Sequence, residues 1–248
     1  MTQPDNPSLR TRQRQQREAQ LLQLARHILQ HEGFAALSMD RLTALSDVSK
    51  GTIYNHFCSK EDVLTALSIS SLQRLNLLFQ RAVQHGTHSR ECALALHYCY
   101  CLFGESEPAL FLCLFSAATP AVLEKASPER LALRLQLEQQ LLAQCEQLIQ
   151  QACLHLVLPP AAGTLVSHYA YLNWALAFGS NALFAPGQHL GLFRQISLSD
   201  VCLQGVNLLF DGMGWQPLST QQDYQQYWRQ LDLQLKPGLL EIIHKELS

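Results

Sequence analysis

A short stretch of this sequence concentrates polar side chains that can hydrogen-bond to nucleic acid. Lys50, Thr52, Asn55 and His56 lie among apolar residues and are predicted to point outward from a small helical core. An arginine-rich arm, residues 10–14, precedes them and can follow phosphates or enter a minor groove. The same pattern also fits the solvated faces of any small helical bundle. Spacing alone therefore leaves DNA binding and a plain surface both open.

Three helices must position these side chains. Apolar residues at helical spacing predict a first helix from about Arg12 to Glu32, with Gly33 as its stop. Ser38 is an N-cap for a short second helix, Asp47–Ser49 forms a turn, and a third helix runs from about Lys50 to Phe57. Two short helices joined by a tight turn and backed by a longer helix can place a helix in the DNA major groove. The predicted core of this head is formed by Ala25, Ile28, Phe34, Leu42, Leu45, Val48, Ile53 and Phe57.

The segment from Gly33 to Leu64 closely resembles the signature of the TetR/AcrR family of transcriptional regulators. The resemblance is strongest over Val48–Phe57 (VSKGTIYNHF) and over Ser59–Leu64 (SKEDVL). It implies a helix-turn-helix DNA-binding domain and double-stranded DNA as a partner. The remainder of the chain fits the family in length and helical pattern but carries no comparable signature.

The resemblance also implies roles for particular residues. Gly51 permits a close approach of the backbone to DNA. Tyr54, His56 and Lys60 fall where family members commonly touch phosphates. Structural alternatives remain, because Tyr54 can partly pack on the first helix and Lys60 can serve only its own helix terminus.

Base reading is expected from Lys50, Thr52 and Asn55 on the implied recognition helix, since lysine favours guanine and asparagine favours adenine. Ser38 and Thr52 are further candidates for phosphate contacts. The complete candidate DNA-binding set is Arg12, Arg14, Ser38, Lys50, Gly51, Thr52, Tyr54, Asn55, His56 and Lys60.

The sequence departs from the family at the turn, where Ser46-Asp47 stands in place of a usual Ala-Gly pair. Aspartate tolerates left-handed backbone geometry better than most residues, so the turn is expected to survive. Thr43 also replaces a usual small alanine. Both changes are expected to alter the angle between helices without removing DNA binding.

Beyond the head the chain is predicted to be helical nearly throughout, so the fold class is all-α. The expected organisation is a disordered tail (1–9), a helix-turn-helix domain (10–58) and a helical regulatory and dimerisation body (59–248). Ser59 caps a long helix to about His85, and Ser127-Pro128-Glu129 starts another to about Leu158. Further helices are expected over Ser89–Phe103 and Glu107–Ala117, with a break at Gly104, and over Ala162–Phe184, Leu198–Gly212 and Gln221–Leu235.

A homodimer is the expected assembly. The stretch from Leu165 to Phe178 carries no charge and is apolar on nearly all sides, and such a helix must be covered on all sides. The resemblance implies that this helix and the next pair with their symmetry mates in a four-helix bundle. The alternative is a core made entirely within one chain. The predicted interface residues are Trp174, Phe178, Val206, Leu209 and Phe210.

The body is also the expected place for a small-molecule inducer, as in many members of the family. Because no charged residue lies among the candidates, a largely apolar or neutral ligand is expected. Aromatic residues at helical spacing equally suit a plain core. The candidate ligand-binding residues are Tyr98, Phe103, Phe111, Phe115, His168, Tyr169, Asn173 and Trp174.

Eight cysteines and no C-x-x-C pair give little reason to expect a metal site or a cofactor. Cys99 and Cys101 are two residues apart, so they point to different faces of a helix. Cys58, beside the recognition helix, is the expected exposed thiol, and thiol-based sensing remains open. No catalytic constellation or phosphate-binding glycine loop is present, so the chain is not expected to be an enzyme.

The distribution of charge supports a DNA-binding head on an acidic body. From Met1 to Lys60 the chain has eight Lys/Arg against five Asp/Glu, and the rest has ten against fifteen. The uncharged run from Gln147 to Phe193 is broken by prolines and polar residues, which disfavours a membrane span.

The expected function is a cytoplasmic repressor that binds a pseudo-palindromic operator as a dimer and is released by a small ligand. The alternative is a DNA-bound protein whose body recruits a protein partner.

Overall fold

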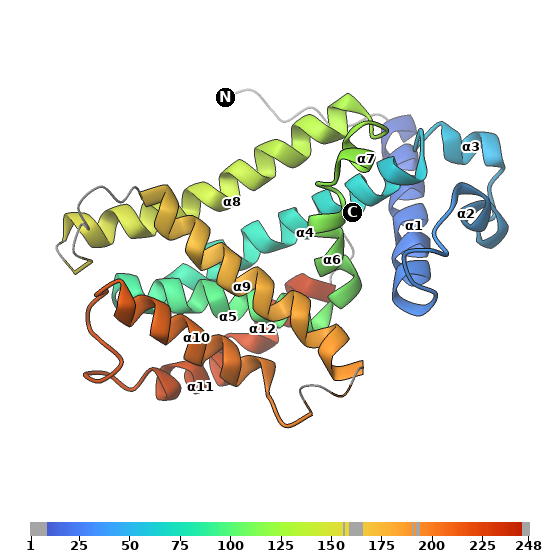
Figure 1. Cartoon of the computed structure of the whole chain (residues 1–248). Coiled ribbons are helices and arrows are strands. Elements are labelled where there is room, and N and C mark those ends of the chain that lie inside the picture. The colour runs from blue at the N-terminus through green and yellow to red at the C-terminus, as the bar shows by residue number, and fades with distance from the viewer. Residues whose placement is uncertain (1–8, 156, 159–165, 190, 192–193, 245–248) are drawn as a thin grey trace, which may run out of the picture. The chain divides into compact units, whose positions relative to one another are not determined.

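The computed structural model describes residues 9–155, 157–158, 166–189, 191 and 194–244. Every regular element in these ranges is a helix, which confirms the all-α prediction (Figure 1). The predicted tail lies outside the described residues except for Leu9, which begins the first helix. The described residues divide into two compact units: unit 1 takes those within 9–71 and 112–134, and unit 2 takes those within 72–111 and 135–244.

Local capping signals explain the helices of unit 1. Gly33 adopts a left-handed φ of 84°, and its N–H donates to the carbonyl of Ile28, which ends the first helix as predicted. The hydroxyl of Ser38 accepts from the N–H of Arg41 at 3.1 Å, which confirms the predicted cap of the second helix. Unit 1 holds α1 (Leu9–His31), α2 (Met39–Leu45), α3 (Lys50–Tyr54), the start of α4 (Lys60–Ala82), the end of α6 (Pro108–Ser116), α7 (Pro120–Leu123) and the start of α8 (Pro128–Leu154).

The core of the head differs in part from the predicted set. Ala25, Ile28, Leu42, Ile53 and Phe57 are fully buried, as expected. The other three predicted core residues are more exposed: Leu45, the last residue of α2, is 38% exposed, and Phe34 and Val48, in the connections outside α2 and α3, are half-buried. The core also takes Leu21, Leu29, Leu37 and Met39, which are buried.

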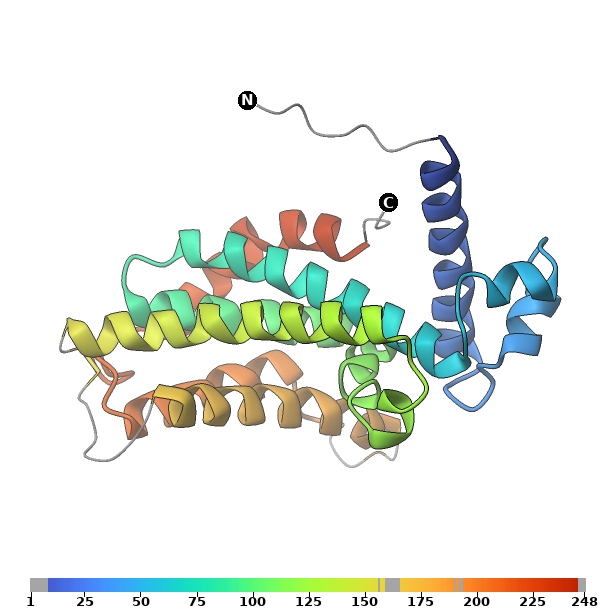
Figure 2. The same ribbon diagram turned by 90° about the horizontal axis from the view of Figure 1, so that it is seen from above.

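Unit 2 is built around α5 (Ser89–Ser106), whose residues from Ala93 to Gly104 are all buried. Figure 2 shows α9 (Val166–His189) and α10 (Leu198–Gly212) lying side by side, and Gly205 allows Leu176 to approach α10 closely. The unit also contains the remainders of α4, α6 and α8, together with η1 (Val83–His85), α11 (Tyr224–Gln234) and α12 (Lys236–His244).

The predicted break at Gly104 is wrong. α5 continues to Ser106, and the chain leaves the helix at Glu107. A β-carbon on Gly104 would collide with the side-chain oxygen of Asn181 on α9, so the glycine serves close packing rather than helix termination. α7 and α12 were not expected, because each is short and begins beside a proline.

Other predicted boundaries shift by a few residues. α8 ends at Leu154, and α9 runs on to His189, past the predicted end at Phe184. The predicted start of that helix, Ala162, lies outside the described residues. Within the described chain, no helix combines the length and apolar character needed to cross a membrane.

Candidate DNA-binding site

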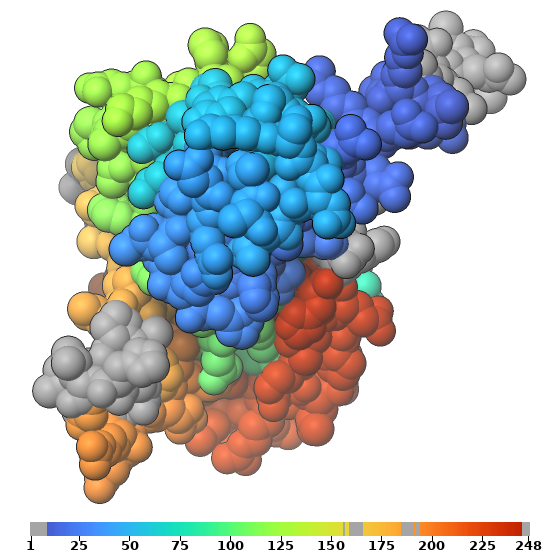
Figure 3. Space-filling model, turned by 90° about the vertical axis from the view of Figure 1, so that its right-hand side faces the viewer, coloured from blue at the N-terminus to red at the C-terminus, as the bar shows by residue number. Residues whose placement is uncertain are grey.

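The third helix of the head, α3, presents a polar face to solvent. Ser49 caps it by accepting from the N–H of Thr52 at 3.2 Å, and Ile53 anchors its inner side with 0% exposure. Tyr54 is 46% exposed, and Gly51 and Asn55 are also exposed. In the space-filling view of Figure 3, the surface of α2 and α3 faces the viewer. This is the geometry that a recognition helix requires.

Lys50 is exposed at the start of α3 but is already paired. Its ammonium lies 2.6 Å from Asp40 on α2, and this hydrogen bond raises the pKa of Lys50. Sequence reasoning missed Asp40, because a carboxylate in the first turn of α2 fits simple stabilisation of the helix dipole. A base contact by Lys50 requires the lysine to exchange this partner for DNA.

The predicted arginine arm is helical and belongs to α1. Arg12 and Arg14 are exposed there, and a guanidinium nitrogen of Arg14 donates to the carbonyl of Asn55 at 3.5 Å. Arg14 therefore lies beside the C-terminal end of α3. Ser38, the cap of α2, and Thr52 are half-buried, so each of these hydroxyls has a structural role as well as a candidate DNA contact.

The expectation that His56 points outward is wrong. The residue is 8% exposed, and its Nδ1 atom lies 3.4 Å from the carboxylate of Glu18 on α1. α3 ends at Tyr54, three residues earlier than predicted, so His56 is already in the connection that turns back toward the core.

The helix α4 begins beside this connection. Lys60 is its first residue and is half-buried, and the hydroxyl of Ser59 accepts from the N–H of Asp62 at 3.0 Å, which confirms the predicted cap. The same hydroxyl donates to the carbonyl of Lys125 at 2.9 Å. The start of α4 is thereby tied to the segment that precedes α8.

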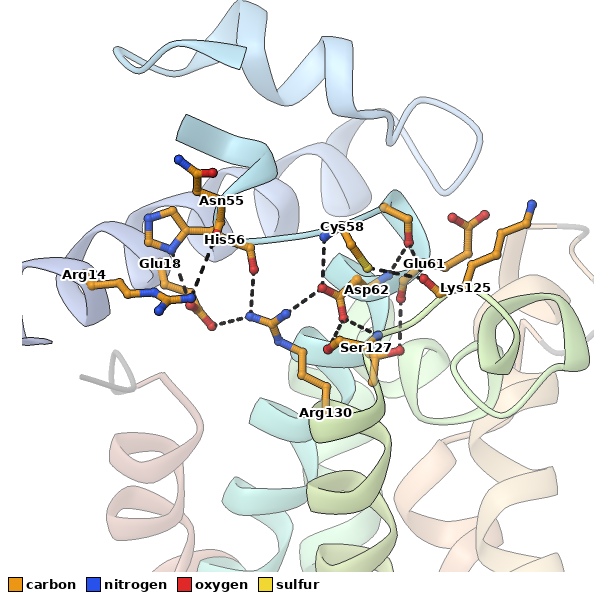
Figure 4. A network of polar contacts seen from close by, with 12 residues as sticks. Arg14, Glu18, Asn55, His56, Cys58, Glu61, Asp62, Lys125, Ser127 and Arg130 are labelled. Carbon is orange, nitrogen blue, oxygen red and sulfur yellow. Dashed lines mark hydrogen bonds and ion pairs between the residues drawn. The ribbon is translucent and has the colours of Figure 1, made fainter. Parts of the chain in front are cut away.

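Asp62 is the most deeply buried charge near the head, with 1% exposure. Figure 4 shows how its carboxylate is satisfied. One oxygen accepts from the N–H of Cys58 at 3.2 Å and from Arg130 at 2.6 Å; the other accepts from the N–H and the hydroxyl of Ser127 at 3.0 and 2.8 Å. The Ser127 hydroxyl, predicted to cap α8, donates to Asp62.

Cys58 is exposed, as predicted, and is not an activated thiol. Burial and the neighbouring Asp62 raise its pKa, and its sulfur donates to the carbonyl of Lys125. A raised pKa leaves less of the reactive thiolate at neutral pH. In the part of the chain that the structure describes, no group of three or more His, Cys, Asp or Glu side chains is arranged to hold a metal ion.

The helices that carry this site match a known domain. Residues 21–67 match the family described as bacterial regulatory proteins, tetR family. The chain therefore carries the helix-turn-helix domain of the TetR/AcrR family of transcriptional regulators. The matched residues run from the middle of α1 into α4, and they include α2 and α3. The function of such a helix-turn-helix domain is DNA-binding regulation of transcription.

Solved structures share the fold at low sequence identity. A bacterial regulatory protein in the tetR family from Rhodococcus RHA1 is 16% identical, with a TM-score of 0.63 over 80% of this chain and 97% of that one. The TetR-family regulator PfmR from Thermus thermophilus is 17% identical, with a TM-score of 0.61 over 77% and 97%. The ketosteroid transcriptional regulator KstR2 of Mycobacterium tuberculosis is 16% identical, with a TM-score of 0.59 over 79% and 94%. No curated protein matches the chain.

The candidate ligand residues of the regulator fall into two groups. Tyr98, Phe103, Phe111 and Tyr169 are buried, and Phe111 stacks on Phe178 with ring centroids 5.6 Å apart. Asn173 is half-buried and accepts from His97 at 2.8 Å. The outer group is exposed and consists of Phe115, His168 and Trp174.

The predicted dimer residues are also divided. Trp174 is 54% exposed, and Phe178 and Leu209 are half-buried. Val206 and Phe210 are buried at 1% and 0%, because this face of α10 packs on α5. They belong to the core of their own chain, and Leu208, at 69% exposure, lies on the outer face of the same helix.

Proposed function

We propose that this regulator is a repressor that binds a pseudo-palindromic operator as a homodimer and is released by a small neutral ligand. The observation that carries the proposal is the outward face of α3, where Gly51, Tyr54 and Asn55 are exposed and Ile53 holds the helix to its core. A C2 dimer presents two such helices to two half-sites.

The exposed apolar side chains of α9 and α10 support the dimer. Val201 and Leu208 are seven residues apart and share one face of α10, with exposures of 37% and 69%. On α9, which carries no charged residue, Tyr171, Leu172 and Leu183 are 62%, 48% and 68% exposed. Large exposed apolar side chains on adjacent helices are typical of a protein interface.

A polar atom in unit 2 supports a neutral ligand. The side-chain oxygen of Asn181 is buried, and among the described residues it has no hydrogen-bond donor. Buried acceptors of this kind are usually satisfied in the complete state of a protein. A ligand with an apolar body and one hydroxyl or N–H group would supply the missing donor.

A substitution at Gly51 tests the DNA-binding surface. A β-carbon at this position would meet only the Ser49 hydroxyl, 3.9 Å away, so the free protein has room for a side chain. Gly51→Ala and Gly51→Gln should leave the melting temperature unchanged or raised, because glycine disfavours helix by about 1 kcal/mol relative to alanine. Operator affinity should fall with side-chain size, since the added atoms occupy space needed by the DNA.

The operator for this test is obtained by selecting DNA from a random library with the full chain. Two inverted half-sites are the expected motif, and the mass of the complex gives the number of chains. A selected motif that Gly51→Gln still binds normally would exclude α3 as the reading surface. Release of that DNA by a neutral compound supports the repressor, and capture of a protein by the DNA-bound body would favour the recruiting alternative.

A further inference from the structure

One arginine outside the helix-turn-helix contacts three of its parts. Arg130, in the first turn of α8, donates to Asp62 on α4 at 2.6 Å, to Glu18 on α1 at 2.8 Å and to the carbonyl of His56 at 3.1 Å (Figure 4). Its guanidinium also lies over the ring of Phe57, 4.7 Å from the centroid. All of these groups belong to unit 1. We call this arrangement the Arg130 clasp.

The clasp acts where the recognition helix has the least support of its own. α3 has only five residues, and its C-terminal end continues directly into the connection that holds His56 and Phe57. So short a helix cannot fix its own direction, and most of its stability comes from its surroundings. The hydrogen bond to the His56 carbonyl and the cover over Phe57 therefore fix the end of α3 against α1 and α4.

The chemistry of the clasp requires a guanidinium. Arg130 is 18% exposed, and it is shared by two carboxylates, one of them the buried Asp62. Its planar fork donates to several acceptors at once while one face covers an aromatic ring. A lysine at this position would keep the charge, but its compact ammonium cannot make all these contacts together.

The position of Arg130 on α8 suggests what the clasp does. α8 begins in unit 1 and continues without a break into unit 2. We propose that Arg130 is a positioning residue for DNA reading, which locks the end of α3 in place and makes operator affinity depend on the placement of the first turn of α8. The proposal rests on the DNA-binding function proposed above.

A neighbouring residue provides a matched control. Arg134 lies one turn further along α8, is 6% exposed, and donates to the Ser68 hydroxyl on α4 and to the Leu114 carbonyl on α6, each at 3.1 Å. Like Arg130, it is an arginine of unit 1 that bonds to α4, and its two named partners lie outside the α3–α4 connection. Arg130→Lys and Arg134→Lys therefore both remove guanidinium hydrogen bonds that join α8 to α4, and only the first removes the clasp.

The first measurement needs no DNA. Amide hydrogen exchange of the full chain should be at least about tenfold faster at residues 53–58 in Arg130→Lys, because local opening of α3 becomes easier. Arg134→Lys should leave exchange in these residues unchanged. Glu18→Gln removes the half-exposed ion pair between Glu18 and Arg130 and should give a smaller increase in the exchange rate. This variant replaces Arg130→Lys in the test if Arg130→Lys does not fold. Equal protection in all variants, or the same increase in both arginine variants, would overturn the proposal.

The second measurement uses the selected operator and an unrelated duplex. Arg130→Lys should bind the operator about tenfold more weakly, which corresponds to about 1.4 kcal/mol. Its affinity for the unrelated duplex and its salt dependence should not change, because the positive charge is retained and Arg130 bonds to the protein's own groups. Unchanged operator affinity would contradict the proposal. A wild-type chain that selects no operator would instead refute the proposed function, and the exchange measurement would still decide on the clasp.

Discussion

The ammonium of Lys50 lies 2.6 Å from a carboxylate oxygen of Asp40 and joins the start of α3 to α2. Both side chains are largely exposed, at 55% and 80%, so the pair adds little to the stability of the fold. The carboxylate of Asp40, however, places a negative charge at the surface proposed to meet DNA. The pair therefore bears on DNA affinity and specificity more than on folding.

Removing this carboxylate should strengthen DNA binding. In Asp40→Asn, the lysine no longer has to leave an anionic partner, and phosphates no longer meet a like charge. We expect affinity for any duplex to rise several-fold at low salt, with less preference among bases at the position that Lys50 reads. Fluorescence anisotropy at several salt concentrations measures the first effect, and DNA selection measures the second. Asp47→Asn removes an equal charge from the exposed turn and is the control. If both variants give identical results, the change in DNA binding depends on net charge alone and not on the partner of Lys50.

Lys60 should contribute one phosphate contact. It begins α4 and is only half-buried, so its ammonium can reach the DNA surface. Lys60→Ala should weaken binding to all duplexes and lower the slope of log affinity against log salt by about one. Lys236→Ala removes the same charge from unit 2 and should leave the slope unchanged. If the two variants give the same slope, Lys60 is not among the phosphate contacts.

The head was predictable because its signals are local. Ser38 and Ser59 each start a helix by accepting a hydrogen bond from the N–H three residues later, and such spacings are visible in the sequence. The burial of His56 was not visible, because its partner Glu18 lies 38 residues earlier. Arg130 is separated from Asp62 by 68 residues, and the sequence around the first turn of α8 predicts only an exposed arginine at this position.

In the body, the sequence likewise does not show which face of a helix is buried within its own chain. α10 carries apolar residues on more than one side, so the sequence predicts that it is covered without indicating which side meets its own chain. The packing of α5 decides this, because Phe210 meets the ring of His97 edge-on and packs at a tilt against Trp215. Val206 turns inward with Phe210, and Leu208 is left outside.

Acidification should destabilise unit 2 through His97. Burial lowers the pKa of this imidazole from 6.5 to about 4, and the Nε2 atom bonds to Asn173 at 2.8 Å. Because the folded value is the lower one, the stabilisation is complete above about pH 6.5 and is lost as the pH falls toward 4. Between pH 7 and pH 5 the free energy of unfolding should drop by about 2 kcal/mol from this residue alone.

Urea unfolding of His97→Gln measures that contribution, since glutamine can still donate to Asn173 but does not titrate. The variant should lose less stability than the wild type over this pH range. His155→Gln, at an exposed position in unit 2, should behave like the wild type. A pH dependence that His97→Gln leaves intact would assign the acid sensitivity to other groups.

A charge on the outer face of α10 should separate the subunits without unfolding them. Leu208 is 69% exposed, so Leu208→Glu costs the single chain little, whereas in a dimer built on this face two carboxylates would meet near the twofold axis. Leu233→Glu, at 79% exposure on α11, makes the same change away from the proposed interface. Val206→Glu should unfold the chain, because that residue is 1% exposed.

Light scattering should give a mass near 27.9 kDa for Leu208→Glu and twice that for Leu233→Glu. Operator affinity of Leu208→Glu should fall by about 10²-fold or more, because a monomer loses the effective concentration of a linked second head. A Leu208→Glu chain that remains dimeric and binds the full operator normally would place the interface on another surface.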